Sequence, residues 1–265
     1  MAPTDEFGGV RLYRGDCLDV LPRLAAGSVQ TMWTDPPYGH GNMQDDLQAA
    51  RVRDGVKGAR VAAVAPIARD TAIEYEPLID AVLPELARVM DPDCCCCCCC
   101  CAGGGGPSPA FGWLALRLDV SPLEFFHAVI WDKSARGDGL GWRYRRNYEF
   151  VMVAHRQGGK LRWNPESAAL PNVIRTPPVR DRLHPNEKPV ALVRRFIEAH
   201  TEPGDVVLDP FMGSGTTGLA CQQTGRTFIG VESDPTHYAI ALKRLRHADG
   251  AGSLFDPKQL TLTDG

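Results

Sequence analysis

The 265-residue chain is predicted to form an α/β fold in which a mostly parallel central sheet carries helices on both faces. Short apolar runs of strand length alternate with longer segments whose apolar residues recur every three or four positions, as in amphipathic helices. A glycine-rich turn at 213–215 separates one such strand from the helix after it, and Glu232 ends the next strand. The hydrophobic fraction of 44% is typical of a globular protein and excludes a disordered chain.

The N-terminal half supplies the first strand–helix units. Two consecutive prolines end the strand at 29–34, because a proline cannot donate a ladder hydrogen bond. Residues 39–72 are polar and weakly patterned, and we expect a mobile loop there. The expected strands are 10–13, 29–34, 94–101, 126–131 and 148–154, and the expected helices are 17–24, 75–89 and 111–118.

The C-terminal half resumes the alternation after a stretch, 156–185, that is basic, contains several prolines and lacks a periodic pattern. The expected helices are 190–200, 216–221 and 236–246, and the expected strands are 206–209 and 227–231. We interpret residues 10–247 as a single domain with an insertion at 133–185. The polar tail at 248–265 is expected to be loose.

Charge is distributed unevenly along the chain. Residues 133–188 contain 12 Lys and Arg against 5 Asp and Glu, whereas the rest of the chain contains 17 against 27. Clustered basic residues attract phosphates, so the middle of the chain is a candidate polyanion-binding face. A solvated surface whose charges balance across the fold is the alternative, and charge alone does not decide between them.

Eight of the ten cysteines form an unbroken run from Cys94 to Cys101. Adjacent residues of a strand point to opposite faces, so such a run cannot supply the paired spacing of a zinc site. Reduced cysteine behaves as a small apolar residue when it is buried. We therefore predict a buried strand of free thiols and no metal site.

Sequence composition also excludes two classes of protein. The apolar runs fall short of the ~20 residues that are needed to cross a bilayer. The N-terminus lacks the basic and apolar regions of a secretion signal. We expect a cytoplasmic protein without a membrane partner.

Two motifs follow strands, at the edge where open α/β sheets bind their ligands. Asp209 begins the first, which continues through the glycine turn into a helix whose N-terminus presents unpaired N–H groups. The second, Asp35-Pro36-Pro37-Tyr38, combines a carboxylate, outward carbonyls and an aromatic face, which suits a planar base with an exocyclic amino group. A plain glycine turn and a capped Pro-Pro turn are the structural alternatives.

With the segment His184-Pro185-Asn186-Glu187-Lys188-Pro189, these motifs resemble the signature of the DNA amino-methyltransferases. Their order resembles the beta type, in which the catalytic motif precedes the cofactor loop and the target-recognition region lies between them. The resemblance covers residues 12–245 and implies a Rossmann-like methyltransferase fold in a prokaryotic or phage protein. It also implies S-adenosylmethionine as the cofactor and double-stranded DNA as the partner. A homodimer and a cognate restriction endonuclease stay open.

The resemblance assigns a set of residues to the cofactor. Glu232 would accept the ribose hydroxyls, Asp16 would contact the adenine, and Asp209 would lie near the amino group. Helix capping is the alternative for Asp16, and a solvent-exposed charge is the alternative for Lys188. The assigned residues are Asp16, Lys188, Asp209, Phe211, Gly213, Ser214, Gly215, Thr216 and Glu232.

A second set would hold the target base. Hydrogen bonds from the amine to the Asp35 carboxylate and the Pro36 carbonyl would localise the nitrogen lone pair for attack on the sulfonium methyl group. The base would be flipped out of the duplex and stacked on Tyr38, with Pro37 completing the motif. The expected DNA contacts come from the basic insertion, namely Arg143, Arg145, Arg146, Arg156, Lys160, Arg162, Arg175, Arg180 and Arg182.

We predict transfer to N6 of adenine, because relatives with Asp at the first catalytic position mostly modify adenine, whereas Ser accompanies cytosine. N4 of cytosine is the alternative. An RNA base or a protein glutamine is a further alternative, although the glutamine enzymes carry Asn at that position. A non-catalytic DNA-binding protein is disfavoured by the intact Asp35 and glycine loop.

Overall fold

The computed structural model describes residues 2–37, 72–100, 110–133, 147–167, 169–179 and 187–250. Nine described strands form one sheet in the order β1-β2-β9-β8-β3-β4-β6-β5-β7. The strands are β1 (Asp5–Phe7), β2 (Val10–Arg14), β3 (Val29–Thr34), β4 (Met90–Cys100), β5 (Leu123–Asp132), β6 (Tyr148–Arg156), β7 (Val173–Arg175), β8 (Val206–Asp209) and β9 (Thr227–Glu232). The helices are α1 (Cys17–Val20), the 3-10 turn η1 (Leu21–Arg23), α3 (Ala72–Val89), α4 (Ala110–Asp119), α5 (Val190–His200), α6 (Thr216–Thr224) and α7 (Pro235–Gly250).

The sheet is mostly parallel, as the sequence predicts. Strands β2, β9, β8, β3 and β4 run parallel to one another, and β7 runs parallel to β5. Strand β6 is antiparallel to both of its neighbours, so its first residues lie at the edge where the parallel strands end. We call this edge, where Thr34, Asp209 and Glu232 end their strands, the carboxyl edge.

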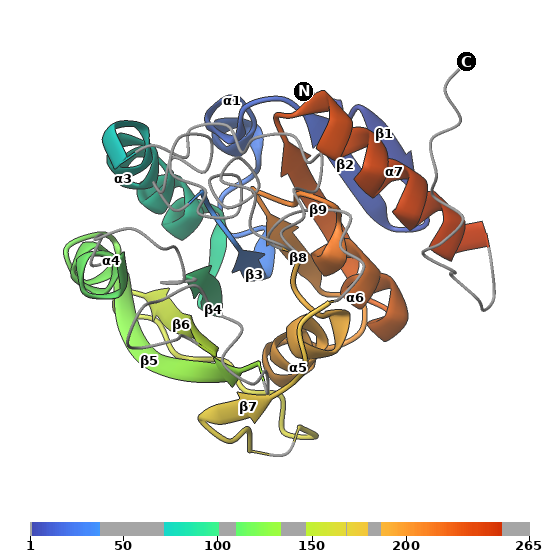
Figure 1. The fold of residues 1–265 in the computed structure, drawn as a ribbon. Coiled ribbons are helices and arrows are strands. Elements are labelled where there is room, and N and C mark those ends of the chain that lie inside the picture. Colours follow the sequence, from blue (N-terminus) through green and yellow to red (C-terminus); the bar gives the residue numbers. More distant parts are fainter. Residues whose placement is uncertain are drawn as a thin grey trace, which may run out of the picture.

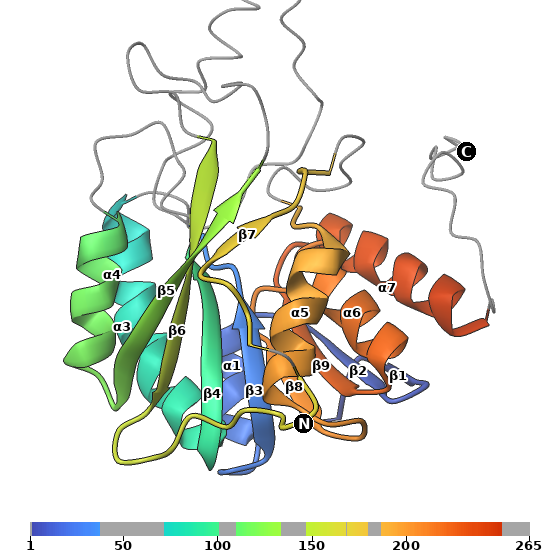
Figure 2. The same ribbon diagram turned by 90° about the horizontal axis from the view of Figure 1, so that it is seen from below.

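Helices cover both faces of the sheet (Figures 1 and 2). Helices α5, α6 and α7 pack on one face, and α1, α3 and α4 pack on the other. Because successive side chains of a strand alternate, Met32 of β3 enters one core and Trp33 enters the other. The Trp33 ring contacts Phe196 of α5 at 5.1 Å between ring centroids. Packing on both faces therefore fixes β3, and with it the start of the Asp35-Pro36-Pro37-Tyr38 motif, in the middle of the sheet.

The cysteine run forms an interior strand. Strand β4 lies between β3 and β6, with Cys96 opposite Met32 and Ala154. The strand prediction is confirmed for the described residues, whereas Cys101 and the side chains of this run lie outside the description. The other two cysteines, Cys17 and Cys221, are buried free thiols.

Several boundaries differ from the sequence prediction. The expected helix at 17–24 is split into α1 and η1, because Pro22 lacks the N–H that a continuing α-helix requires. Helix α7 continues to Gly250, so it includes the first three residues of the expected tail, and Ala72 already belongs to α3. The predictions of a loop at 39–71 and a loose tail at 251–265 fall on residues outside the description.

Strands β1 and β7 were not predicted. Each has three residues, too short to display a periodic pattern, and each is defined by pairing with a longer neighbour, β2 or β5. Within the described residues, no helix is long and apolar enough to cross a membrane. The single-domain assignment for 10–247 stays a prediction.

Candidate active site

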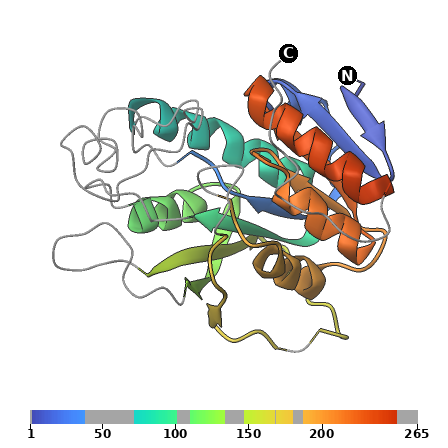
Figure 3. The ribbon, with the colours of Figure 1, turned by 45° about the vertical axis from the view of Figure 1, so that its right-hand side comes forward.

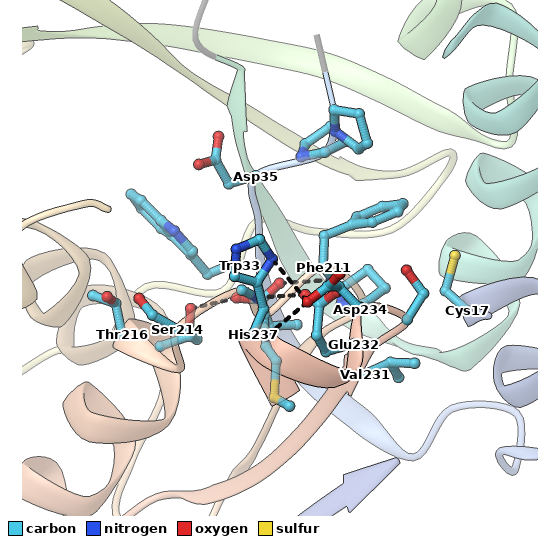
Figure 4. Close-up of a pocket in the computed structure, with 18 of the residues that line it drawn as sticks. Cys17, Trp33, Asp35, Phe211, Ser214, Thr216, Val231, Glu232, Asp234 and His237 are labelled. Atoms are coloured by element: carbon cyan, nitrogen blue, oxygen red, sulfur yellow. Dashed lines mark hydrogen bonds and ion pairs between the residues drawn. The ribbon is translucent and has the colours of Figure 1, made fainter. Parts of the chain in front are cut away.

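A cavity opens at the carboxyl edge, beside the ends of β3, β8 and β9 (Figure 4). Helix α7 (red), which follows β9, lies beside α6 (orange) in Figure 3. The cavity brings together side chains from segments that lie far apart in the sequence. Gly215 is absent from its lining, and Tyr38 lies outside the described residues. The predicted site residues that line it are Asp16, Asp35, Pro36, Pro37, Lys188, Asp209, Phe211, Gly213, Ser214, Thr216 and Glu232.

The predicted glycine turn is present between β8 and α6. Gly213 and Gly215 have φ angles of 51° and 81°, in the left-handed region that favours glycine. A Cβ atom on Gly215 would lie 3.1 Å from Cβ of Ala241 on α7. Gly215 therefore permits the turn and the close packing of α7, whereas Gly213 faces the cavity.

Asp209 fixes the beginning of this turn. Its Oδ1 accepts from the Phe211 N–H at 3.1 Å, and its Oδ2 accepts from the Thr217 hydroxyl at 2.5 Å. Burial raises the pKa of Asp209 to about 7, because the two hydrogen bonds offset only part of the cost of burying the charge. The carboxyl group thus ties β8 to both the turn and α6.

Glu232 has the corresponding role at the end of β9. Its Oε2 accepts from the Gly213 N–H at 3.0 Å, and its Oε1 accepts from the Asp234 N–H at 2.8 Å. Burial raises the pKa of Glu232. Asp234 in turn caps α7 by accepting from the backbone N–H groups of Thr236 and His237 at 2.8 Å each. Glu232 therefore holds the turn and the start of α7 in fixed positions around the cavity.

His237 is a lining residue that the sequence reasoning missed. It is buried, and its Nδ1 lies 3.7 Å from Oδ1 of Asp234. Figure 4 shows its ring beside Glu232 and Asp234. The sequence does contain a signal for it: β9 ends in the acidic residue Glu232, α7 begins at Pro235, and His237 lies in the first turn of that helix.

Asp16 borders the same cavity from the N-terminus of α1. Its Oδ1 accepts from the Leu18 N–H at 3.0 Å, which is the geometry of a helix cap. The capping alternative is thereby confirmed. The carboxylate also lines the cavity, so the predicted contact with a cofactor stays a prediction.

At the opposite end of the cavity, the half-buried Asp35 forms an ion pair with the buried Lys188. Lys188 Nζ lies 2.6 Å from Asp35 Oδ2, and only 6% of the lysine side chain is exposed. This lysine is therefore not the solvent-exposed charge that was the alternative. Its Nζ also lies 3.7 Å from Oε2 of Glu149 on β6, and Glu149 pairs with Lys133.

Sequence reasoning missed Glu149. An acid inside the apolar segment Tyr148–Arg156 is an unusual strand residue, and this is the signal that could have identified it. Its partner is unpredictable from the pattern, because the contact depends on the antiparallel course of β6 beside β4.

A second ion pair lies next to the first. Arg244 of α7 donates from Nη2 to Glu187 Oε1 at 2.8 Å and from Nη1 to the Ser214 carbonyl at 2.7 Å. Glu187 and Lys188 are neighbours, so one dipeptide is linked to the glycine turn through Arg244 and contacts Asp35 through Lys188. Arg244 was not predicted, although its position on a helix face that is otherwise apolar marks it.

The predicted DNA-binding residues are not all brought together. Arg175 lies at the carboxyl edge, where its Nε donates to Asp132 Oδ2 at 2.9 Å. Arg156 ends β6 at the opposite edge, Lys160 follows it there, and Arg162 pairs with Asp205 at 3.1 Å. These three residues lie away from Asp35 because β6 is antiparallel to β4. The others lie outside the described residues, namely Arg143, Arg145, Arg146, Arg180 and Arg182.

Among the described residues, no group of three or more His, Cys, Asp and Glu side chains is arranged to hold a metal ion. The lining of the cavity offers carboxylates, a lysine, backbone N–H groups and an apolar wall that includes Phe211. This chemistry suits an organic ligand that carries positive charge.

Comparison with known proteins finds methyltransferases that are similar over most of the chain. The chain is 28% identical over 276 residues to the Type II methyltransferase M.Cfr9I of Citrobacter freundii, covering 92% of this chain and 90% of that protein. It is 30% identical over 280 residues to the Type II methyltransferase M.XycI of Xanthomonas campestris pv. cyanopsidis, covering 90% and 88%.

Two solved structures are also similar. The crystal structure of the M1.HpyAVI–SAM complex has a TM-score of 0.62 and 25% sequence identity, covering 89% of this chain and 98% of that one. The PvuII DNA methyltransferase (cytosine-N4-specific) has a TM-score of 0.67 at 16% identity, covering 94% of each chain, and this likeness concerns the fold alone. Residues 29–243 match the DNA methylase model of the N6/N4 methyltransferases, so the chain belongs to that family.

Proposed function

We propose that this DNA methyltransferase transfers a methyl group to N6 of adenine in double-stranded DNA. The observation that carries the proposal is the position of Asp35 at the end of β3, in one cavity with the glycine turn. Membership of the N6/N4 family supports DNA methylation, and Asp rather than Ser at the first catalytic position supports adenine.

S-adenosylmethionine is the methyl donor, and the residues of the cavity fit it. When bound, it supplies a methyl group on a positively charged sulfur. The carboxyl groups of Asp16, Asp209 and Glu232 line the cavity, and acidic linings favour a cationic ligand. The Gly213 conformation lets the backbone approach closely, and the half-buried Phe211 supplies an apolar surface.

Individual cofactor contacts are proposed from the family motif. The turn from Phe211 through Gly215 would hold the methionine part with Asp209 near its amino group, and Ser214 and Thr216 would border it. Glu232 already accepts two backbone N–H groups, yet a carboxylate has about four acceptor positions, so ribose hydroxyls can still bind. Asp16 would contact the adenine.

The target base is proposed to bind at the other end of the cavity. The Asp35 carboxylate and the Pro36 carbonyl accept hydrogens of its exocyclic amine, which localises the nitrogen lone pair. Positioning then brings the nitrogen into line with the methyl group without a covalent enzyme intermediate. Pro37 stiffens the motif, and Tyr38 would stack on the flipped base.

The basic segment 133–185 is proposed to contact the DNA backbone. Arg175 supports this, because it is exposed and lies at the carboxyl edge. The names of the two Type II relatives favour a cognate restriction endonuclease as a functional partner in the cytoplasm of a bacterium. A homodimer stays a prediction.

Nucleoside analysis tests the base assignment. Unmethylated DNA is incubated with the protein and S-adenosylmethionine, digested to nucleosides and analysed by mass spectrometry. We expect N6-methyladenine, and we expect Asp35→Ala to lower its formation by about 10²–10³-fold, since one acceptor at the reacting group is lost. Cofactor binding by calorimetry should stay unchanged in this variant. N4-methylcytosine without N6-methyladenine would show the base assignment to be wrong and leave the family assignment intact.

A further inference from the structure

The ion pair between Lys188 and Asp35 joins two segments that are 153 residues apart in the sequence. The Lys188 Nζ is 2.6 Å from the Asp35 carboxylate, and its side chain is 6% exposed. Burying an ammonium group is costly, so lysine is rarely buried without a compensating partner. Here the partner is the residue that is proposed to bind the reacting amine.

Negative charge surrounds this pair. Glu149 of β6 places Oε2 3.7 Å from the Lys188 ammonium, and Asp209 of β8 interacts electrostatically with Asp35. Lys133, after β5, is bonded to Glu149. Strand β4, which pairs with β3, contributes cysteines, whose side chains lie outside the description. Lys188 thus places a positive charge in contact with Asp35, and two further carboxyl groups interact with this pair.

The charge state of Asp35 decides whether it can act on an amine. An ionised carboxylate only accepts hydrogen bonds, whereas a protonated carboxyl group also donates one. A donor directed at the amine would engage the lone pair that must attack the methyl group. Repulsion from Glu149 and Asp209 favours the protonated form, and an adjacent cation favours the ionised form.

We propose that Lys188 is a positioning residue for methyl transfer: its charge keeps Asp35 ionised, and its hydrogen bond fixes the carboxylate for the target amine. The inference rests on the proposed function, since it concerns the same reaction. One bond from Lys188 leaves acceptor positions on the carboxylate for the base. Glu149 also contacts the Lys188 ammonium, at 3.7 Å, and its negative charge opposes the effect of the lysine on Asp35.

Lys188 also lines the cavity, where it could instead bind the cofactor directly. The two roles predict different losses. A cofactor ligand contributes to cofactor affinity, whereas a residue that acts through Asp35 contributes to turnover and to its pH dependence.

The full-length protein and its Lys188→Gln and Lys188→Arg variants provide the test. We expect Lys188→Gln to keep the Kd for S-adenosylmethionine within about twofold and to lower kcat at neutral pH at least tenfold. The acidic limb of its pH–rate profile should move about one to three pH units higher, because an opposite charge beside a carboxylate shifts its titration by that amount. Lys188→Arg, which keeps the positive charge, should return the acidic limb to its position in the unmodified protein. Exposed Lys243→Gln is the matched control.

Glu149→Gln supplies a change of opposite sign. Removing a negative charge near Asp35 should move the acidic limb below that of the unmodified protein. General damage to the fold would not move the acidic limb to higher pH in Lys188→Gln and to lower pH in Glu149→Gln. Glu124→Gln, at an exposed position of β5, is its control.

A direct readout does not depend on activity. In protein labelled with ¹³C at the aspartate carboxyl groups, the signal that disappears in Asp35→Asn reports the ionisation of Asp35. We expect that signal to titrate at higher pH in Lys188→Gln. An unmoved signal, or a loss of cofactor affinity as large as the loss of kcat, would overturn the inference. If the unmodified protein produced no methylated DNA, only the proposed function would be contradicted. The carboxyl signal would still show whether Lys188 keeps Asp35 ionised.

Discussion

The two ends of the cavity are built in different ways. One end, which is proposed to bind the cofactor and is called the cofactor end, contains Asp209, Gly213, Glu232 and Asp234, whose hydrogen bonds connect residues at most 19 positions apart. The other end, which is proposed to bind the target base and is called the base end, contains the Lys188–Asp35 bond between residues 153 positions apart. Glu149 reaches the same lysine from a third segment.

This difference separates a binding motif from an assembled site. The cofactor end depends on local backbone geometry, so glycines and an acid at fixed positions suffice to form it. The base end forms only when β3, β6 and the segment before α5 meet at the carboxyl edge. We therefore expect it to respond more strongly to changes in packing than the cofactor end does.

The largest expected effect comes from the residue that links the two ends. Arg244 is 4% exposed and bonds both Ser214 of the glycine turn and Glu187, the neighbour of Lys188. Replacing it with Met removes one member of a buried ion pair, which typically costs about 3–5 kcal/mol. Urea denaturation should show this loss in the free energy of unfolding.

The matched control lies two residues further along α7. Arg246 pairs with Asp5 at 2.7 Å, but its side chain is 58% exposed. Exposed pairs contribute at most about 1 kcal/mol, so Arg246→Met should change stability little. Equal losses in the two variants would mean that the buried link does not differ from a surface ion pair.

A second prediction concerns the cofactor end. Glu232→Ala removes the acceptor for two backbone N–H groups, and each hydrogen bond to a charged group contributes about 1.5–3 kcal/mol. The glycine turn and the start of α7 should loosen together, and affinity for S-adenosylmethionine should fall at least about a hundredfold. Calorimetry measures it. An affinity within a few-fold of the unmodified protein would show that the turn is held by other contacts.

The local elements around the glycine turn were predicted from the sequence, whereas the contacts around Asp35 were predicted incompletely. Strand β8, the glycine turn and the position of Glu232 at the end of β9 follow from residues that lie close together in the chain. Asp35 was identified because the Pro-Pro motif ends a strand. Lys188 was predicted as a cofactor residue rather than as the partner of Asp35, and Glu149, which contacts Lys188, was missed. Both contacts depend on strand order and direction, which no local pattern contains.

The same limit applies to Arg156, Lys160 and Arg162. Their composition resembles that of the rest of the basic insertion, yet the antiparallel course of β6 carries them to the far edge of the sheet. The short strands β1 and β7 were missed for a related reason, since three residues define no period.

A third prediction uses the buried Asp209. Its pKa rises from 3.8 to about 7 on folding, so the folded protein retains a proton that the unfolded chain releases. The contribution of this group to stability is present below pH 4 and is lost as pH rises toward 7, by up to about 1.4 kcal/mol per pH unit. Asp209→Asn cannot titrate. The stability of the unmodified protein relative to this variant should therefore fall over that window.

Urea denaturation at pH 4.5 and pH 7 measures this difference. Glu232 titrates in both proteins, so its contribution cancels. Asp249→Asn, at an exposed position on α7, should show no comparable slope. A difference between unmodified protein and Asp209→Asn that stays constant with pH would mean that Asp209 is ionised throughout.

The smallest expected effect distinguishes the two edges of the sheet in DNA binding. Arg175, at the carboxyl edge, has a side chain that is 75% exposed and lies on the same side as Asp35, whereas Arg156 lies at the opposite edge. If the duplex lies across the carboxyl edge, Arg175→Ala should weaken binding by less than about tenfold and reduce the slope of log affinity against log salt by about one. Arg156→Ala should leave both quantities unchanged, although the two arginines belong to the same basic segment. Binding titrations at several salt concentrations measure both, and an effect of Arg156→Ala equal to that of Arg175→Ala would place the duplex elsewhere. Position in the folded sheet, rather than membership of a basic stretch, would then no longer explain which arginines contact DNA.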